Sequence, residues 1–462
     1  MLLRFRCRNF FSIREEQEIS LVAVNSSADE RNPSLLDTPI KGLKALRCAA
    51  IYGANASGKS NVLNAMRTFS RMVSRSQREW NPTGPIPTWK PFALDEVSSS
   101  GDSVFEIDFV IDATVYNYGF KFNSSAILEE WLKDNTGRAK TLFQRETQGP
   151  SARVRFPGKN LGATSEDSKH LESIRVQTRA NSLFLSSAAQ NNHKFLSVIF
   201  TWISERFHVI SSREESSLHI YTAELCSKPD RKQQIRALLE SADAGIADLV
   251  IEDEVMPERL QKAVTAMFTA FSEAMPEAAP PSVVKEPFSM SRHNIKMLHR
   301  GANGALYPLD FDDESSGTRA YFRMLGPLLD VLRDGSLVLI DELESSLHPL
   351  LARELVRMLG DPILNPNGAQ LIFATHDTNL LDLDLLRRDQ IWLTEKGKDG
   401  ATVLAALSDY KPRKDQNIAL AYLHGRFGAI PVIDEGLVRS ALETINPLKA
   451  EPFSEESSDQ VR

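Results

Sequence analysis

The sequence is poor in cysteine and contains no long apolar run. Its 462 residues include only three cysteines, Cys7, Cys48 and Cys226, and no two of them have C-x-x-C spacing. An odd number without that spacing argues against a disulfide scaffold and against a zinc site. No apolar stretch approaches the roughly 18 residues that a membrane-spanning helix needs. The N-terminus alternates apolar and basic residues, unlike a signal peptide. We therefore expect a soluble, cytoplasmic protein that is not held at a membrane.

Charge and hydrophobicity are both moderate. The chain is 42% hydrophobic and 25% charged, with a formal net charge of −7. This composition is too apolar for a disordered chain. The acidic balance argues against a surface that binds polyanions over its whole area, while it leaves a local basic patch open. A chain of this length usually divides into about two or three domains.

The pattern of apolar residues predicts an α/β protein. Apolar runs at 46–52, 337–340 and 370–374 indicate buried strands, because each run ends in polar residues. Alternating side chains at 104–111 and 114–122 indicate two further strands. The expected division is an α/β segment 1–150, a mainly helical insertion 151–286, a second α/β segment 287–435 and a C-terminal tail 436–462, of which the last dozen residues are expected to be disordered. The finer expectations are a polar loop at 149–167, a helix with an apolar stripe at 260–271 and a linker at 276–281.

One segment has the full pattern of a phosphate-binding loop. GANASGKS, from Gly53 to Ser60, matches G-x-x-x-x-G-K-S and has a buried strand before it and a helix after it. In such a loop, backbone N–H groups surround a phosphate at the helix N-terminus, the lysine reaches the terminal phosphates and the serine binds Mg²⁺. The candidate nucleotide-binding residues are Gly53, Asn55, Ala56, Ser57, Gly58, Lys59, Ser60 and Asn61, with Ser60 also a candidate Mg²⁺ ligand.

A second segment, LVLIDE at 337–342, is an apolar strand that ends in two carboxylates. Asp341 is the candidate for the acid that holds Mg²⁺ in a phosphate-loop enzyme. Glu342 is the candidate general base that orients the attacking water. An Asp-Glu pair alone is more often a solvated strand end, so this assignment depends on the phosphate loop.

Two shorter segments suggest how the nucleotide is enclosed. ESSGT, at 314–318, places Ser315, Ser316 and Gly317 at the start of an amphipathic helix, where a second anion site can form. Because one chain already has a phosphate loop, we expect this turn to cover the nucleotide of a neighbouring copy. FATH places His376 just after an apolar strand, where a neutral imidazole can contact the γ-phosphate. Alone, each segment is also explained as a capping serine or a structural histidine.

Together these segments resemble the ATP-binding-cassette (ABC) branch of P-loop ATPases, in the subgroup of SMC, RecF and OLD-type proteins. The similar parts are the Walker A loop at 53–61, the signature motif at 314–318, the Walker B strand at 337–342, the D-loop at 345–349, the switch histidine at 375–377 and the opening turn at 9–13. The segment 410–431 is similar to the terminal part of stand-alone ATPases in bacterial anti-phage systems, in particular those of PARIS-type defence. The resemblance covers roughly 1–125 and 287–431. The signature departs from the usual pattern, with Glu314 in place of leucine and Ser316 in place of glycine.

The resemblance implies an ABC-type ATPase head with mixed and parallel sheets, which binds ATP and Mg²⁺ and hydrolyses ATP. It implies catalytic roles for Lys59, Glu342 and His376, with Ser60 and Asp341 at the metal. It also implies contact of Ser315 and Gly317 with the partner copy's γ-phosphate, and hence a dimer of heads or a higher homo-oligomer. A separate effector, a Toprim-type nuclease in related systems, and a phage-derived trigger are the implied partners. The glutamine that usually contacts Mg²⁺ is not placed by the sequence.

Two alternative functions are also compatible with the sequence. A RecF- or SMC-like ATPase acting on DNA is disfavoured by the absence of a strong basic patch and of a long heptad arm. The stripe formed by Arg67, Arg71, Arg75 and Arg78 is more typical of a solvated or partner-facing surface than of DNA contact. A nucleotide-gated scaffold with little turnover is supported by the altered signature and opposed by the intact Lys59, Asp341 and Glu342.

Two further activities are disfavoured. A fused Toprim nuclease would need an Asp-x-Asp pair at a strand end, whereas Asp382 and Asp384 lie in a leucine-rich stretch that looks helical. Guanine recognition would need an Asn-Lys-x-Asp segment, which the sequence lacks, so ATP is favoured over GTP.

Overall fold

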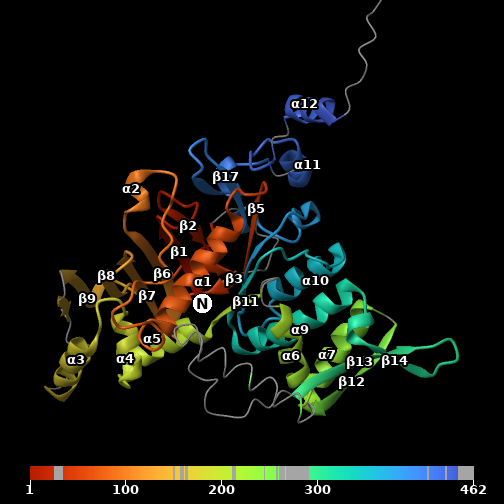
Figure 1. Ribbon diagram of the computed structural model, residues 1–462, viewed down its shortest axis with the longest axis horizontal. Coiled ribbons are helices and arrows are strands. Elements are labelled where there is room, and N and C mark those ends of the chain that lie inside the picture. Colours follow the sequence, from red (N-terminus) through yellow and green to blue (C-terminus); the bar gives the residue numbers. More distant parts are fainter. Residues whose placement is uncertain are drawn as a thin grey trace, which may run out of the picture.

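The fold is an α/β arrangement with two main sheets. The computed structural model describes residues 1–24, 35–148, 151–156, 161, 165–210, 215–243, 245–255, 259, 266, 291–413, 416–431 and 434–445 (Figure 1). The helix expected at 260–271, the linker at 276–281 and the end of the tail lie outside these residues, apart from residue 266. The α/β class with mixed and parallel sheets is confirmed.

The first sheet is antiparallel and has seven strands in the order β10-β9-β8-β7-β6-β1-β2. Its strands are β1 (Leu2–Arg8), β2 (Gln17–Ser20), β6 (Ser103–Ile111), β7 (Thr114–Phe122), β8 (Ile127–Asp134), β9 (Lys140–Gln148) and β10 (Ser151–Arg155). The alternating aromatic residues of β7 form a buried face, on which the ring of Phe120 stacks against Phe69 with a centroid distance of 5.5 Å. The polar loop expected at 149–167 is wrong, because β10 and the start of α3 (Ser165–Gln177) lie there. β10 lies at the edge of the sheet and pairs with β9 only. An edge strand can be polar, so its sequence does not show the apolar pattern that predicts a strand.

The second sheet has six strands in the order β11-β15-β16-β5-β17-β18. Its strands are β5 (Cys48–Gly53), β11 (Phe207–Ile210), β15 (Leu337–Ile340), β16 (Gln370–Ala374), β17 (Ile391–Lys396) and β18 (Thr402–Ala406). All pairs are parallel except β17 with β18. The carboxyl ends of parallel strands lie at one edge of a sheet, so the loops after β5, β15 and β16 meet at that edge.

Helix α1 (Lys59–Arg75) lies between the two sheets, as Figure 1 shows. Its apolar stripe is completely buried at Met66, Phe69 and Met72. Phe69 contacts Phe120 of the antiparallel sheet and lies 6.2 Å from the ring of Phe207 in β11. The helix that begins at the phosphate loop is therefore packed into the core that joins both sheets.

The remaining elements cover the faces and ends of these sheets. Around the six-stranded sheet lie α6 (Glu215–Leu225), α7 (Pro229–Ala242), α9 (Ser316–Asp334) and α10 (Pro349–Gly360). A three-stranded sheet contains β12 (Ile246–Val255), β13 (Ser291–Arg300) and β14 (Leu306–Asp310). The other elements are α2 (Glu96–Ser99), α4 (Phe184–Gln190), α5 (Lys194–Glu205), α11 (Ile418–Leu423), α12 (Glu435–Ile445) and the pair β3 (Leu35–Asp37) with β4 (Lys44–Leu46).

The segment 151–286, expected to be a mainly helical insertion, is not a separate unit in the described part of the chain. Its strand β11 pairs with β15, the predicted Walker B strand, in the six-stranded sheet. Its strand β12 pairs with β13, which lies beyond the expected boundary at 286. Both pairings join residues far apart in sequence, and local apolar patterns do not report such contacts.

The leucine-rich stretch around Asp382 is not a helix, contrary to expectation. It forms a turn between the 3₁₀ helices η3 (Thr378–Leu380) and η4 (Arg388–Gln390). Asp382 accepts a hydrogen bond of 2.7 Å from Arg353 of α10. Tertiary contacts of this kind override the helix propensity of leucine.

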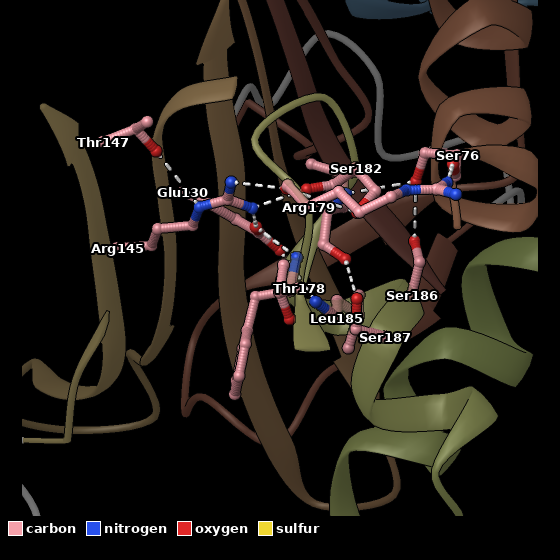
Figure 2. Close-up of polar contacts among 12 residues, drawn as sticks. Ser76, Glu130, Arg145, Thr147, Thr178, Arg179, Ser182, Leu185, Ser186 and Ser187 are labelled. Carbon is pink, nitrogen blue, oxygen red and sulfur yellow. Dashed lines mark hydrogen bonds and ion pairs between the residues drawn. The ribbon is translucent and has the colours of Figure 1, made fainter. Parts of the chain in front are cut away.

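A buried polar cluster fastens the antiparallel sheet to α4 (Figure 2). Glu130 of β8 and Arg145 of β9 have fully buried side chains and form an ion pair of 3.6 Å. Glu130 accepts hydrogen bonds from the backbone N–H groups of Phe184 and Leu185 at the start of α4, at 2.6 and 3.0 Å. Arg145 donates to the backbone oxygens of Arg179, Ala180 and Ser182.

The same region also holds the end of α1. Arg179 donates to the backbone oxygens of Ser76 and Gln77, at 2.8 and 3.0 Å. Ser186 donates to the backbone oxygen of Val73 and accepts from the hydroxyl of Ser76. Figure 2 shows the side chains of Arg179 and Ser186 both pointing toward Ser76. The C-terminal end of α1 is thereby fixed to the segment that Glu130 and Arg145 organise.

Candidate functional site

The predicted phosphate loop connects the buried strand β5 to α1. Residues 54–58 form the loop, and Ala56 has a φ of 61°, which is unusual for a residue other than glycine. Gly58, with a φ of 112°, precedes the helix; a Cβ atom there would lie 2.1 Å from Oγ1 of Thr402. No side chain caps the N-terminus of α1. The N–H groups of Asn61 and Val62 already donate to the backbone oxygen of Gly58. The N–H groups at the very start of the helix, those of Lys59 and Ser60, are therefore the ones available to an anionic ligand.

Three polar side chains outside the motif, those of Ser12, Thr394 and Thr402, form hydrogen bonds that hold the loop in place. The hydroxyl groups of Ser57 and Thr394 share a hydrogen bond of 2.6 Å. Thr402 donates to the backbone oxygen of Ser57 at 2.8 Å. Ser12 lies 2.7 Å from Thr402 and accepts a hydrogen bond from Asn61. Thr394 and Thr402 were not predicted from the sequence, because a threonine in an apolar strand belongs to no motif of its own.

Lys59 is buried under the loop that it follows. Its ammonium group donates to the backbone oxygens of Gly53 and Ala54 at 2.9 and 3.1 Å. Burial lowers the pKa of Lys59, while the attraction of Asp341, Glu344 and Glu342 opposes this shift. The ammonium group is therefore held against the backbone of the loop and lies within electrostatic range of three carboxylates.

The strand end after β15 brings the predicted Mg²⁺ ligands together. Ser60 donates a hydrogen bond of 3.1 Å to Oδ1 of Asp341, although 281 residues separate them. Glu342 is exposed and has a φ of 55°. A residue other than glycine in this conformation is typical of sites where backbone strain serves function. A cavity between this strand end and α9 is lined in part by Met324, Asp341 and Glu342.

His376 follows β16 at the same edge of the sheet. Burial lowers the pKa of His376, as does the positive charge of Lys59, while Glu344, Glu342 and Asp341 act in the opposite direction. The imidazole is therefore within electrostatic range of the lysine and of all three carboxylates. Glu344 was not predicted from the sequence. The only signal in the sequence was a third carboxylate, two residues after the Asp341-Glu342 pair.

The predicted signature turn lies apart from the phosphate loop. Ser315 caps α9, because its hydroxyl accepts a hydrogen bond of 3.0 Å from the backbone N–H of Thr318. Ser315 and Ser316 are exposed, and a Cβ atom on Gly317 would lie 3.0 Å from the backbone oxygen of Ser346. Among the described residues, no hydrogen bond or ion pair joins Ser315, Ser316 or Gly317 to residues 53–61.

The segment 410–431 lies against the strand that leads into the loop. The ring of Tyr422 in α11 meets the ring of Tyr52 edge-on, with a centroid distance of 5.8 Å. Burial raises the pKa of Tyr422, and a hydrogen bond with the backbone of Gly53 opposes the rise. The hydroxyl of Tyr422 also donates to the backbone oxygen of Ala429 at 3.0 Å. From the sequence, segment 410–431 was known only by its resemblance to other ATPases, and its contact with β5 was not predicted.

The residues present fit a nucleotide with Mg²⁺. A serine hydroxyl and a carboxylate lie within hydrogen-bond distance at an uncapped helix N-terminus, and oxygen ligands of this kind suit Mg²⁺. Across the described ranges, no group of three or more His, Cys, Asp or Glu side chains is arranged to hold a metal by itself. Mg²⁺ at such a site is usually held by one or two protein ligands together with phosphates and water.

Comparison with known families and structures gives one match that covers most of the chain. The family model described as "AAA domain, putative AbiEii toxin, Type IV TA system" matches residues 48–382. No protein with a curated function matches the chain. In the described part of the chain, no helix is both long and apolar enough to cross a membrane.

Two solved structures of SMC heads show a loose likeness. One is an SMC head bound to the C-winged helix domain of ScpA, at 11% identity and a TM-score of 0.38, covering 88% of this chain and 99% of the other. The second is the SMC head domain from Thermotoga maritima, at 11% identity and a TM-score of 0.37, covering 88% and 98%. Both TM-scores are below 0.5, so the fold is defined by the sheets of this chain and not by its likeness to these structures.

Proposed function

Because the chain belongs to the family described as "AAA domain, putative AbiEii toxin, Type IV TA system" and is therefore a P-loop ATPase, we propose that it hydrolyses ATP with Mg²⁺ at the edge of the six-stranded sheet. The single observation that carries the proposal is the hydrogen bond of 3.1 Å between Ser60 and Asp341. These two side chains come from opposite parts of the sequence, and they meet at the start of α1 beside Lys59.

The proposed roles follow from the positions of the side chains. Backbone N–H groups of the loop and of the first turn of α1 hold the phosphates, and Lys59 neutralises their charge. Ser60 and Asp341 hold Mg²⁺, which stabilises the charge that develops on the phosphates. Glu342 accepts the proton of the attacking water. His376 donates a hydrogen bond from its imidazole to an oxygen of the terminal phosphate.

The chemistry is tested with two substitutions and a matched control. Glu342→Gln keeps the shape of the side chain but removes the base, so hydrolysis is expected to fall by about 10²–10⁴-fold while ATP still binds. Lys59→Ala is expected to abolish binding or turnover. Glu354→Gln changes an exposed carboxylate of α10 and serves as the control. Phosphate release near the wild-type rate from the Glu342 variant would rule out Glu342 as the base.

We also propose that two copies enclose each nucleotide. Within the described residues, the signature turn forms no hydrogen bond or ion pair with the phosphate loop of its own chain, and its hydroxyl-rich helix N-terminus is exposed. A second copy can bring that turn to the far side of the phosphates, where N–H groups and the helix dipole favour an anion. Sedimentation of the Glu342→Gln protein with ATP is expected to show a dimer or larger species. A monomer at micromolar concentration would contradict this model.

The biological role that we propose is that of an anti-phage ATPase that controls a separate effector, a Toprim-type nuclease, as in PARIS-type defence. The support is the resemblance of 410–431 to such ATPases and the packing of this segment, through Tyr422, beside the phosphate loop. Loss of protection against phage in cells that carry the Glu342→Gln variant, with the neighbouring gene present, tests this role. Unchanged protection would contradict it.

A scaffold that binds ATP with little turnover is the second candidate, and one observation favours it. Glu314, which replaces the usual leucine of the signature, is buried and lies 2.6 Å from His299 of β13. The start of the signature is thus fixed by a contact that the usual sequence could not make. Phosphate release measured with and without DNA separates the candidates: no release favours the scaffold, and stimulation by DNA favours a repair-type ATPase.

A further inference from the structure

The carboxylate of Glu344 connects two loops at the edge of the six-stranded sheet. Glu344 lies in the turn between β15 and α10, two residues after Glu342. Its Oε1 atom accepts a hydrogen bond of 2.5 Å from the backbone N–H of His376. His376 follows β16, which pairs with β15 in parallel. The bond therefore joins the loop after the Walker B strand to the loop that carries the predicted switch histidine.

The other carboxylate oxygen of Glu344 has no partner. Oε2 is buried and accepts no hydrogen bond within the described part of the chain. A buried charged acceptor without a donor is unfavourable, and such an atom in a native site usually awaits a ligand or an ordered water. The ammonium group of Lys59, whose charge Glu344 attracts, already donates to two backbone oxygens of the phosphate loop.

Glu344 lies close enough to the predicted nucleotide site to act on its charged groups. Together with Asp341 and Glu342, it attracts the charge of both Lys59 and His376. A bound nucleotide would bring phosphate oxygens, which accept hydrogen bonds and cannot satisfy a carboxylate. Water is the donor that a phosphate-binding site contains in addition to the protein's own groups.

We propose that Glu344 is a positioning residue of this site, which holds His376 through Oε1 and accepts a hydrogen bond from a water molecule of the site through Oε2. This proposal rests on the proposed ATPase function. It differs from the role of Glu342, because Glu344 acts on the backbone of the histidine and on the placement of water rather than as a base. Its loss is expected to disturb turnover more than binding.

The test uses two variants and a matched control in the full-length chain. Glu344→Ala removes both acceptors, while Glu344→Gln keeps an oxygen for the His376 N–H and removes the charge. Asp361→Asn is the control, since Asp361 accepts a backbone hydrogen bond of 2.7 Å from Ile363 beyond the end of α10. The chain returns from there to the start of β16, so this carboxylate lies at the opposite edge of the sheet.

The first readout is amide hydrogen exchange at His376 in the protein without nucleotide. Glu344→Ala is expected to speed exchange there by about tenfold or more, because the N–H loses its acceptor. Exchange is expected to stay near the wild-type rate in Glu344→Gln and in the Asp361 control. Unchanged exchange in Glu344→Ala would overturn the link between Glu344 and His376, whatever the activity of the protein.

The second readout is steady-state ATP hydrolysis. Both Glu344 variants are expected to lose about 10–100-fold in kcat with little change in KM, the pattern of misplaced reacting groups. A wild-type kcat in Glu344→Gln would overturn the role in placing water. If the wild type itself hydrolyses no ATP, the proposed function fails, while the exchange experiment still decides the link between the two loops.

Discussion

The buried pair of Glu130 and Arg145 gives the sharpest prediction about stability. Both side chains have 0% exposure, so neither charge can be compensated by bulk water. Replacing Arg145 with methionine keeps much of the side-chain length but leaves the Glu130 carboxylate buried without its cation. It also removes the donor from three backbone oxygens in 179–182. Breaking a buried pair in this way typically costs about 3–5 kcal/mol of unfolding free energy.

The assay is denaturant unfolding followed by circular dichroism, with thermal melting as a second measure. Arg145→Met is expected to lower both the denaturant midpoint and the Tm, in line with a loss of about 3–5 kcal/mol in the free energy of unfolding. The exposed Arg357, which pairs with Glu354 on α10, provides the control; Arg357→Met is expected to change stability by about 0.5 kcal/mol or less.

A second substitution distinguishes the loss of charge balance from the loss of packing. Glu130→Gln keeps one of the two acceptor oxygens, either the one bonded by the Phe184 N–H (Oε2) or the one bonded by the Leu185 N–H and the Tyr118 hydroxyl (Oε1). In the Arg145→Met background it removes the unpaired charge, so the double variant is expected to be more stable than Arg145→Met alone. The reasoning is refuted if Arg145→Met costs less than about 1 kcal/mol, or if the two losses simply add.

The remaining predictions concern the thiols and the site. At pH 8 the folded protein is expected to resist a thiol reagent and to react fully once unfolded, because burial raises the pKa of Cys48 and Cys226 to about 12 and raises that of Cys7 as well, so the thiolate is scarce; rapid modification of the native protein would contradict this. Ser315→Glu is expected to preserve binding of a fluorescent ATP analogue and to abolish phosphate release, since its carboxylate would face the partner's γ-phosphate; unimpaired release would exclude a composite site. Asp341→Asn is expected to raise the Mg²⁺ concentration needed for half-maximal hydrolysis, and an unchanged Mg²⁺ titration would exclude Asp341 as a ligand.

The sequence by itself determined the local elements of the site. Motif spacing and apolar runs predicted the strands at 337–340 and 370–374 with the bounds that the structure has, because a buried parallel strand is a continuous apolar segment. The same local signals predicted α1 after the phosphate loop. Each of these features depends on neighbours within a few residues, which a single sequence records directly.

Only the tertiary structure decided which distant residues meet. The pairing of β11 with β15 joins the expected insertion to the Walker B strand, and the turn around Asp382 replaces a helix that leucine propensity favoured. Thr394, Thr402 and Glu344 support the loop and the histidine through contacts that no local pattern encodes. The residue type of a threonine or a glutamate does not tell whether its side chain is solvated or buried against a backbone group. Its role is therefore set by the fold that brings an acceptor and a donor from different strands to one edge.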